Sequence, residues 1–241
     1  MKKIFITSLL VCVTLSINAQ NWGNKRVRGN GNIVTKTRTT SNYDAIAVGG
    51  SFDVTLVKGK EGKITIVGEE NIIPYIVTEV KNGTLKVRYK KNTNIRTSRK
   101  LTITIPFKNI DGISLGGSGS VVSTDVIKAD DIKFSLGGSG NIRVRVDAQK
   151  VITSIGGSGD IKLSGTTDEL KCSIAGSGSI KAYGLKANTT KATIAGSGSV
   201  RTTVKNRINA KVVGSGSIYY KGNPTHIDSK SLGSGDVIDR N

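Results

Sequence analysis

The sequence predicts an all-β protein: a parallel β-solenoid, or β-helix, with about 19 residues per rung, preceded by a non-repeating β region. The first observation is a repeat. Gly-Ser-Gly followed by Ser, Asn or Asp returns at intervals of 18 to 21 residues, beginning at Gly117, Gly138, Gly157, Gly176, Gly196, Gly214 and Gly233. The second is the alternation of apolar and polar residues on both sides of each copy, which is typical of half-buried strands. Each repeat is therefore predicted to hold two short strands joined at a Gly-Ser-Gly corner.

Residues 1–20 have the features of a secretory signal peptide. Two lysines precede an apolar run over residues 4–15, and small residues follow it. The run is too short to cross a bilayer as a helix, and no transmembrane segment is predicted elsewhere. A lipoprotein signal is the alternative because Cys12 lies in the run, but Val11 stands where lipidation requires a small residue. We therefore expect export across the inner membrane, to the periplasm, the outer-membrane surface or the extracellular space.

Residues 21–110 are expected to form an N-terminal β region that caps the solenoid, because an open terminal rung would expose unpaired strand edges. Alternation predicts strands over residues 53–57, 63–67, 85–89 and 101–106. The Asn82-Gly83 pair predicts a tight hairpin, and residues 71–75 are compatible with one helical turn. Glycines within residues 29–33 and 49–52 predict degenerate corners, and hence one or two rungs before the regular array.

Residues 111–241 are predicted to form the regular array. The residue four positions after each first glycine is apolar every time, which predicts one buried column: Val121, Ile142, Ile161, Ile180, Val200, Ile218 and Val237. Glycine is expected at the corners because sharp turns need backbone angles that a Cβ disfavours. The corner serines are expected to stack as a hydroxyl ladder bonded to backbone groups. Cys172 falls at an inward position, so we expect a buried and unreactive thiol.

The repeated corners, together with the segment Tyr43-Asp44-Ala45-Ile46-Ala47-Val48-Gly49-Gly50-Ser51-Phe52-Asp53-Val54, resemble the head GIN domain family of autotransporter adhesins. The resemblance covers residues 32–241. It implies a right-handed parallel β-helix related in shape to pectin lyases, without catalytic residues and with a role in cell adhesion. No anchoring strands or coiled coil are recognisable after the array, which departs from a complete trimeric autotransporter and leaves surface display and trimerisation open.

The chain is strongly basic. It carries 36 Lys and Arg against 17 Asp and Glu, a net charge of +19. Stacking in register predicts two basic ladders beside the corner edge, formed by residues five positions before or after a corner glycine: Lys133, Arg143, Lys162, Lys171, Lys181, Lys191 and Arg201. A track for an anionic polysaccharide or another cell-surface polymer is the functional interpretation. Ordinary solvated lysines on exposed strands are the alternative, and nucleic acid is not expected because aromatic stacking platforms are few.

No catalytic residue, cofactor site or metal site is predicted. His226 is the only histidine, and no carboxylates recur at a fixed phase where two of them would meet. Nucleophile-elbow and phosphate-loop motifs are absent. Residues 156–160 resemble the calcium-binding nonapeptide of repeats-in-toxin proteins, but the spacing before Asp160 is one residue short and the period is wrong.

These features together predict a secreted or envelope-associated binding protein without catalytic activity. We expect it to act in adhesion or in recognition of an anionic glycan along its basic faces. Two alternatives stay open: a structural envelope protein that associates with copies of itself and, more remotely, a β-helical carbohydrate-active enzyme.

Overall fold

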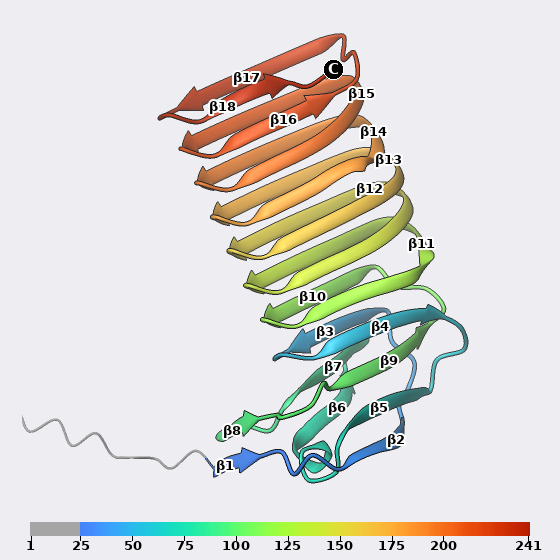
Figure 1. The fold of residues 1–241 in the computed structure, drawn as a ribbon. Helices are drawn as coiled ribbons and strands as arrows, with labels where there is room; N and C mark the ends of the chain where they lie inside the picture. Colours follow the sequence, from blue (N-terminus) through green and yellow to red (C-terminus); the bar gives the residue numbers. More distant parts are fainter. Residues whose placement is uncertain (1–24) are drawn as a thin grey trace, which may run out of the picture.

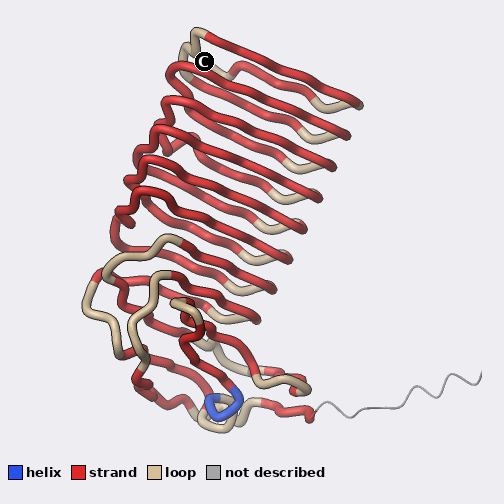
Figure 2. Tube along the Cα trace, turned by 180° about the vertical axis from the view of Figure 1, so that it is seen from behind, coloured by secondary structure: helices blue, strands red, loops and turns tan. Residues whose placement is uncertain are grey.

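The computed structural model describes residues 25–241, and the predicted signal peptide lies outside this range. Figure 1 shows one elongated stack of parallel rungs with a less regular β region at the end near the N-terminus. Seen from behind, the rungs lie one above another, and their corner loops line up along one edge (Figure 2). The all-β solenoid predicted from the repeat is therefore confirmed.

The regular array consists of parallel strands, and the long strands in its middle run from one corner to the next. Two short strands per repeat were predicted, but in the middle of the array they merge at the far end into one strand that bends without a break. The strands are β10 (Gly112–Gly117), β11 (Ser120–Gly138), β12 (Asn141–Gly157), β13 (Asp160–Gly176), β14 (Ser179–Gly196), β15 (Ser199–Gly214), β16 (Ser217–Lys221), β17 (His226–Leu232) and β18 (Asp236–Asp239). Consecutive rungs are therefore hydrogen-bonded to each other along almost their whole length.

The interior of the stack is made of aliphatic columns. Ile142 pairs with Ile161, Ile161 with Ile180, and Ile180 with Val200 in the parallel register. All four side chains are buried, as are Val121 below them and Ile218 above. The predicted column is confirmed as far as Ile218, whereas Val237 on the last rung is only partly buried. Because each residue is covered by the equivalent residue of the next rung, the core extends along the rod without aromatic side chains in its middle.

The corner glycines are needed for two separate reasons. The first glycine of each corner has a positive φ, for example 135° at Gly157. The second packs on the corner below: a Cβ at Gly159 would lie 2.3 Å from the carbonyl oxygen of Gly140. The N–H groups of Ser158 and Gly159 both donate to the carbonyl oxygen of Gly138, at 3.0 Å. Each corner therefore hydrogen-bonds to the corner before it, with no room for a side chain between them.

The predicted hydroxyl ladder is only partly present. Within residues 25–241, the middle serines of the corners are exposed and make no side-chain hydrogen bond. The fourth corner position does link rungs, because Ser199 Oγ donates to Ser179 Oγ at 3.2 Å and Ser120 Oγ donates to Asp53 Oδ1.

The rungs at the start of the stack do not follow the order of the chain. The first rung in the sequence is formed by β3 (Ala45–Gly49) and β4 (Asp53–Lys58), joined at the corner predicted in residues 49–52. β10 and β11 stack on one side of this rung, whereas β7 (Thr84–Tyr89) and β9 (Thr102–Phe107) stack on the other. The chain therefore forms β3 and β4 first, and then β7 and β9, which lie below them. Only afterwards does it form β10 and β11, which lie above β3 and β4 and begin the array.

The remaining N-terminal elements cover the lower end of the stack. They are β1 (Lys25–Arg28), β2 (Ile33–Thr39), β5 (Lys63–Glu69), the 3₁₀ turn η1 (Ile73–Tyr75), β6 (Ile76–Lys81) and β8 (Thr93–Arg96). The Asn82-Gly83 turn joins β6 to β7 as an antiparallel hairpin, with φ of 51° and 69° at its two residues. The predicted strands, hairpin and helical turn of this region are confirmed, whereas β1 and β8 were not predicted.

One predicted corner of this region is wrong. Residues 29–33 do not begin a rung, because β2 pairs antiparallel with β5. Glycine at position 29 instead leaves room for a side chain: a Cβ there would lie 2.0 Å from Glu69 Oε1. Glu69 is buried and accepts hydrogen bonds from the N–H of Gly31 (2.8 Å) and the N–H of Ser98 (2.9 Å). The carboxylate therefore ties two loops of the cap to β5.

Candidate functional site

A continuous row of cationic side chains runs along the outer face beside the corners. Arg143 pairs with Lys162, Lys162 with Lys181, and Lys181 with Arg201 in the parallel ladder. Residues paired in this way lie about 4.8 Å apart along the rod. Arg143 and Lys162 are exposed, and Lys181 and Arg201 are half-buried. We call these four residues the basic row.

The second predicted ladder is not continuous. The register places Ile152 between Lys133 and Lys171, and Asn209 follows Lys191. Lys171 and Lys191 are direct neighbours on β13 and β14. The repeat at Ile152 carries isoleucine where its neighbours carry lysine, so this column of cations is interrupted.

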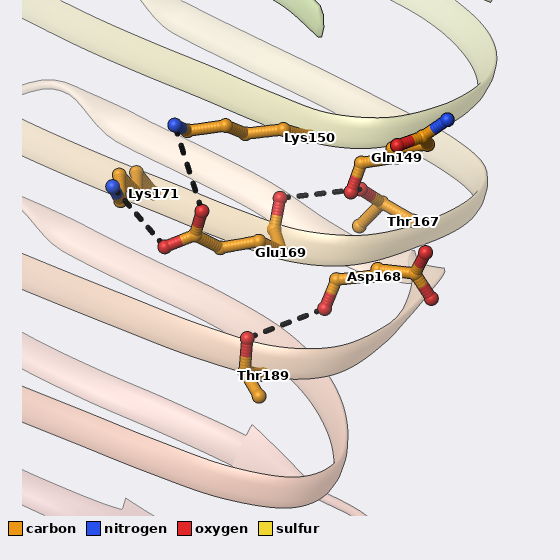
Figure 3. Close-up of polar contacts among 7 residues, drawn as sticks. All are labelled: Gln149, Lys150, Thr167, Asp168, Glu169, Lys171 and Thr189. Atoms are coloured by element: carbon orange, nitrogen blue, oxygen red, sulfur yellow. Dashed lines mark hydrogen bonds and ion pairs between the residues drawn. The ribbon is translucent and has the colours of Figure 1, made fainter. Parts of the chain in front are cut away.

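Carboxylates neutralise some of the predicted cations. Lys171 Nζ lies 3.1 Å from Glu169 Oε1, and Lys150 Nζ lies 3.7 Å from the other oxygen of the same carboxylate (Figure 3). In the basic row, Lys181 pairs with Asp160 from the rung below. Within residues 25–241, Arg143, Lys162 and Arg201 form no ion pair. In the same range, Lys133 and Lys191 form no ion pair either, but the basic row is the longer run of consecutive cations in the two predicted ladders.

Asp160, the residue that invited a calcium interpretation, is used by this ion pair. Its column continues as Asn141 below and Ser179 above, so the carboxylate stands alone at that position. Among residues 25–241, no group of three or more His, Cys, Asp or Glu side chains is arranged to hold a metal ion.

A groove of about 1120 Å³ runs along the opposite edge of the rod, where the strands bend. Its lining is richer in aspartates than in lysines, although the whole protein is basic. The aspartates are Asp44, Asp111, Asp130, Asp131, Asp147 and Asp168, and the lysines are Lys128, Lys186 and Lys205. Ala129, Ala148 and Thr167 stack between its polar walls.

One wall of this groove is a ladder of acids and amides. Gln149 Nε2 donates to Asp130 Oδ1 at 3.2 Å, and Asn188 Nδ2 donates to Asp168 Oδ1 at 2.7 Å. Asp130 and Asp168 share one phase of the repeat, but Gln149 lies between them, so the two carboxylates do not meet. This groove was not predicted from the sequence. Its signal was present: an Asp, Asn or Gln stands eight positions before the corner glycine in consecutive repeats.

Threonine side chains hold the bend beside the groove. Thr167 Oγ1 lies 3.1 Å from the carbonyl oxygens of both Gln149 and Glu169 and shares its single proton between them. Thr189 Oγ1 donates to the carbonyl oxygen of Asp168 at 3.3 Å (Figure 3). These bonds satisfy carbonyl groups where the strand changes direction. The backbone beside the groove is therefore held by side-chain hydrogen bonds.

Neither Cys172 nor His226 takes part in a reactive arrangement. Cys172 lies in the core column between Thr153 and Ala192, and burial raises the pKa of its thiol to about 12. His226 begins β17, is exposed, and shares a 3.0 Å hydrogen bond with the hydroxyl of Thr225. It does not line the aspartate-rich groove.

A comparison with protein families shows which family the chain belongs to. The family model described as "Putative auto-transporter adhesin, head GIN domain" matches residues 42–224. The chain belongs to this head GIN family. The match includes the first rung, most of the cap and the array as far as the loop after β16, so both the basic row and the groove lie on the family domain. A comparison with curated proteins finds no match.

Solved structures share the whole architecture of this head GIN protein. A Bacteroides fragilis protein described as a putative adhesin superposes with a TM-score of 0.85 at 28% identity, covering 89% of this chain and 100% of its own. A Parabacteroides distasonis protein described as a putative lipid binding protein has a TM-score of 0.75 at 30% identity, covering 90% and 100%. A Parabacteroides merdae protein described as a putative adhesin shares the fold. It has a TM-score of 0.71 at 24% identity, covering 90% of this chain and 100% of its own.

The structure contains no helix, within residues 25–241, that is long and apolar enough to cross a membrane. The family and the similar structures support an adhesin-like, non-catalytic role at the cell envelope or outside the cell.

Proposed function

We propose that this head GIN protein binds an anionic polysaccharide or another anionic surface polymer along its basic row, and that this binding serves adhesion. The observation that supports the proposal is the unbroken pairing of Arg143, Lys162, Lys181 and Arg201 across four rungs. A linear polyanion laid along the rod would meet a cation at every rung.

The electrostatics of the row favour such a ligand. Two unit charges at the rung spacing repel by about 0.9 kcal/mol in water. Asp160 offsets this repulsion at Lys181 only. A polymer with closely spaced acidic groups would relieve the remaining repulsion and release counterions, so its binding is expected to weaken as salt increases.

Export to the envelope fits this proposal, since the polymers concerned lie outside the inner membrane. The predicted signal peptide over residues 1–20 would supply the export signal. Periplasm, outer-membrane surface and extracellular medium all satisfy the proposal.

The test is a binding titration with the purified protein against a panel of anionic glycans at two salt concentrations. A variant with Arg143, Lys162, Lys181 and Arg201 changed to Gln is expected to bind at least about tenfold more weakly and to lose most of its salt dependence. The matched control changes four exposed lysines of the N-terminal region, Lys36, Lys60, Lys63 and Lys108, to Gln and so removes the same charge. Equal losses in both variants, or salt-insensitive binding, would contradict the proposal.

Anionic phospholipid vesicles are a useful second probe, because one similar structure is described as a putative lipid binding protein. Binding to vesicles but to no glycan would replace the polysaccharide proposal with lipid recognition.

Self-association is the second candidate function, and the aspartate-rich groove favours it. The groove and the basic row are opposite in charge and both extend along the rod axis. Lateral docking of the basic row of one copy into the groove of another would use both surfaces. Such contacts can add copy after copy without closing into a ring.

Light scattering at low salt tests self-association. Oligomers that dissociate in high salt, and that Asp147→Asn with Asp168→Asn abolish, would support lateral docking. A monomer at all protein concentrations would exclude this second function and leave the first untouched.

A further inference from the structure

The basic row ends at a cluster of tyrosines and cations on the last rungs of the stack. Tyr219 follows Arg201 in the same column, so an aromatic ring takes the place of the next cation. The guanidinium carbon of Arg201 lies 5.7 Å from the centre of the Tyr219 ring, and that of Arg240 lies 5.2 Å from it. Both distances fall within the range of cation–π interactions. The Tyr219 ring therefore contacts two guanidinium groups.

A second tyrosine extends the cluster. Tyr183 lies in a β-bulge of β14, where the register with β13 and β15 shifts. Lys221 Nζ lies 5.3 Å from the centre of its ring. Burial raises the pKa of the Tyr183 hydroxyl, while the positive charges of Arg201 and Arg240 oppose this increase. Both arginines are thus close enough to act on Tyr183 as well as on Tyr219.

The cations of this cluster have no carboxylate partner. Within residues 25–241, Arg201, Lys221 and Arg240 form no ion pair, whereas Lys171 and Lys181 do. Asp239, adjacent in sequence to Arg240, instead accepts hydrogen bonds from the backbone N–H and side-chain amide of Asn241. Ring contacts orient the guanidinium groups without neutralising them, so their N–H groups remain available to an anion.

We infer that Arg201, Tyr219 and Arg240 form a subsite for a tetrahedral oxyanion ester, a sulfate or phosphate group carried by the polymer. This inference rests on the proposed function and places its strongest contact at one end of the basic row. Two guanidinium groups offer two planar sets of donors, and a tetrahedral oxyanion has enough oxygens to accept from both. A single carboxylate is satisfied by one guanidinium, so carboxylated polymers should gain less from the cluster.

The test compares two double variants that remove equal charge. Dextran sulfate and polygalacturonate serve as the sulfated and carboxylated probes, and polyphosphate separates phosphate from sulfate. Arg201→Gln with Arg240→Gln is expected to weaken dextran sulfate binding about tenfold more than Arg143→Gln with Lys162→Gln does. The same pair should affect polygalacturonate no more than the control pair does.

A third variant tests the role of the ring. Tyr219→Leu should weaken dextran sulfate binding about threefold to fivefold, and Tyr219→Phe should retain it, because the aromatic face is kept. Thermal unfolding by circular dichroism shows whether each variant is folded. Equal losses from the two double variants would overturn the subsite while leaving the basic row as the binding surface. Failure of the unsubstituted protein to bind any probe would overturn both.

Discussion

At the scale of single residues, this fold depends most on which positions tolerate a Cβ. Gly156 and Gly157 are adjacent in sequence but differ completely in surroundings. A Cβ at Gly156 would meet nothing within 4 Å, whereas one at Gly157 would lie 2.5 Å from the carbonyl oxygen of Gly138, on a residue whose φ is 135°. The array itself shows the difference, because Ala175 occupies the position equivalent to Gly156 and Gly176 the position equivalent to Gly157.

Gly157→Ala is therefore expected to destabilise the protein by at least about 2 kcal/mol, since it adds backbone strain and a clash. Gly156→Ala, the matched control, should change stability by less than about 0.5 kcal/mol. Thermal unfolding midpoints measured by circular dichroism test the pair. Similar midpoints for the two variants would show that the corners do not stack as described.

Cys172 gives a second prediction at this scale. Its pKa of about 12 and its burial in the core mean that almost no thiolate is exposed at neutral pH. A thiol reagent at pH 8 should leave the folded protein unlabelled and modify one cysteine after denaturation in the chain without residues 1–20. Rapid labelling of the folded protein would show that the column around Cys172 opens.

At the scale of elements, the cap depends on a single buried carboxylate that joins β5 to two loops. Burial tends to raise the pKa of Glu69, but the hydrogen bonds from Ser98 Oγ and from the N–H groups of Gly31, Ser98 and Arg99 lower it below its ordinary value of 4.5. The folded state therefore favours the ionised form. This stabilisation is fully present above the ordinary pKa and is lost as pH falls through the lower pKa of the folded state.

Glu69→Gln should reduce cap stability by about 2 kcal/mol at pH 7, because charged hydrogen bonds are replaced by weaker or mismatched ones. The same variant should remove part of the loss of stability seen in acid. Amide exchange at Gly31 and Ser98 measures the effect locally, with the exposed Glu70→Gln as control. Unchanged protection in Glu69→Gln would mean that the loops are held by other contacts.

The sequence predicted elements well where a local pattern determined them. The period of the corners placed the column through Ile161 correctly, and Asn82-Gly83 located a hairpin from its turn chemistry alone. The corner assigned to residues 29–33 failed because Gly29 accommodates Glu69, a contact 40 residues away along the chain. Local glycine spacing does not distinguish a turn from a close approach of this kind.

At the scale of the whole molecule, the repeat converts sequence phase into surface pattern. A cation five positions after a corner glycine becomes a row along the rod, and an acid or amide eight positions before one becomes a groove wall. The basic row could be predicted from this rule. The interruption at Ile152 and the acid or amide positions can also be read from the sequence. The concavity that turns the acid and amide positions into a groove arises from the bend of the strands. The order of the first rungs could not be predicted, because no local signal shows that β7 and β9 stack below β3 and β4.

The measurement that tests the functional proposal most directly is photo-crosslinking of the protein to a sulfated oligosaccharide, followed by mass spectrometry of the labelled peptides. We predict labels on β12, β13, β14 and β15 beside Arg143, Lys162, Lys181 and Arg201, and on β16 at Tyr219, all competed by high salt. Labels confined to the groove around Asp147 and Asp168, or spread evenly over every basic surface, would contradict it.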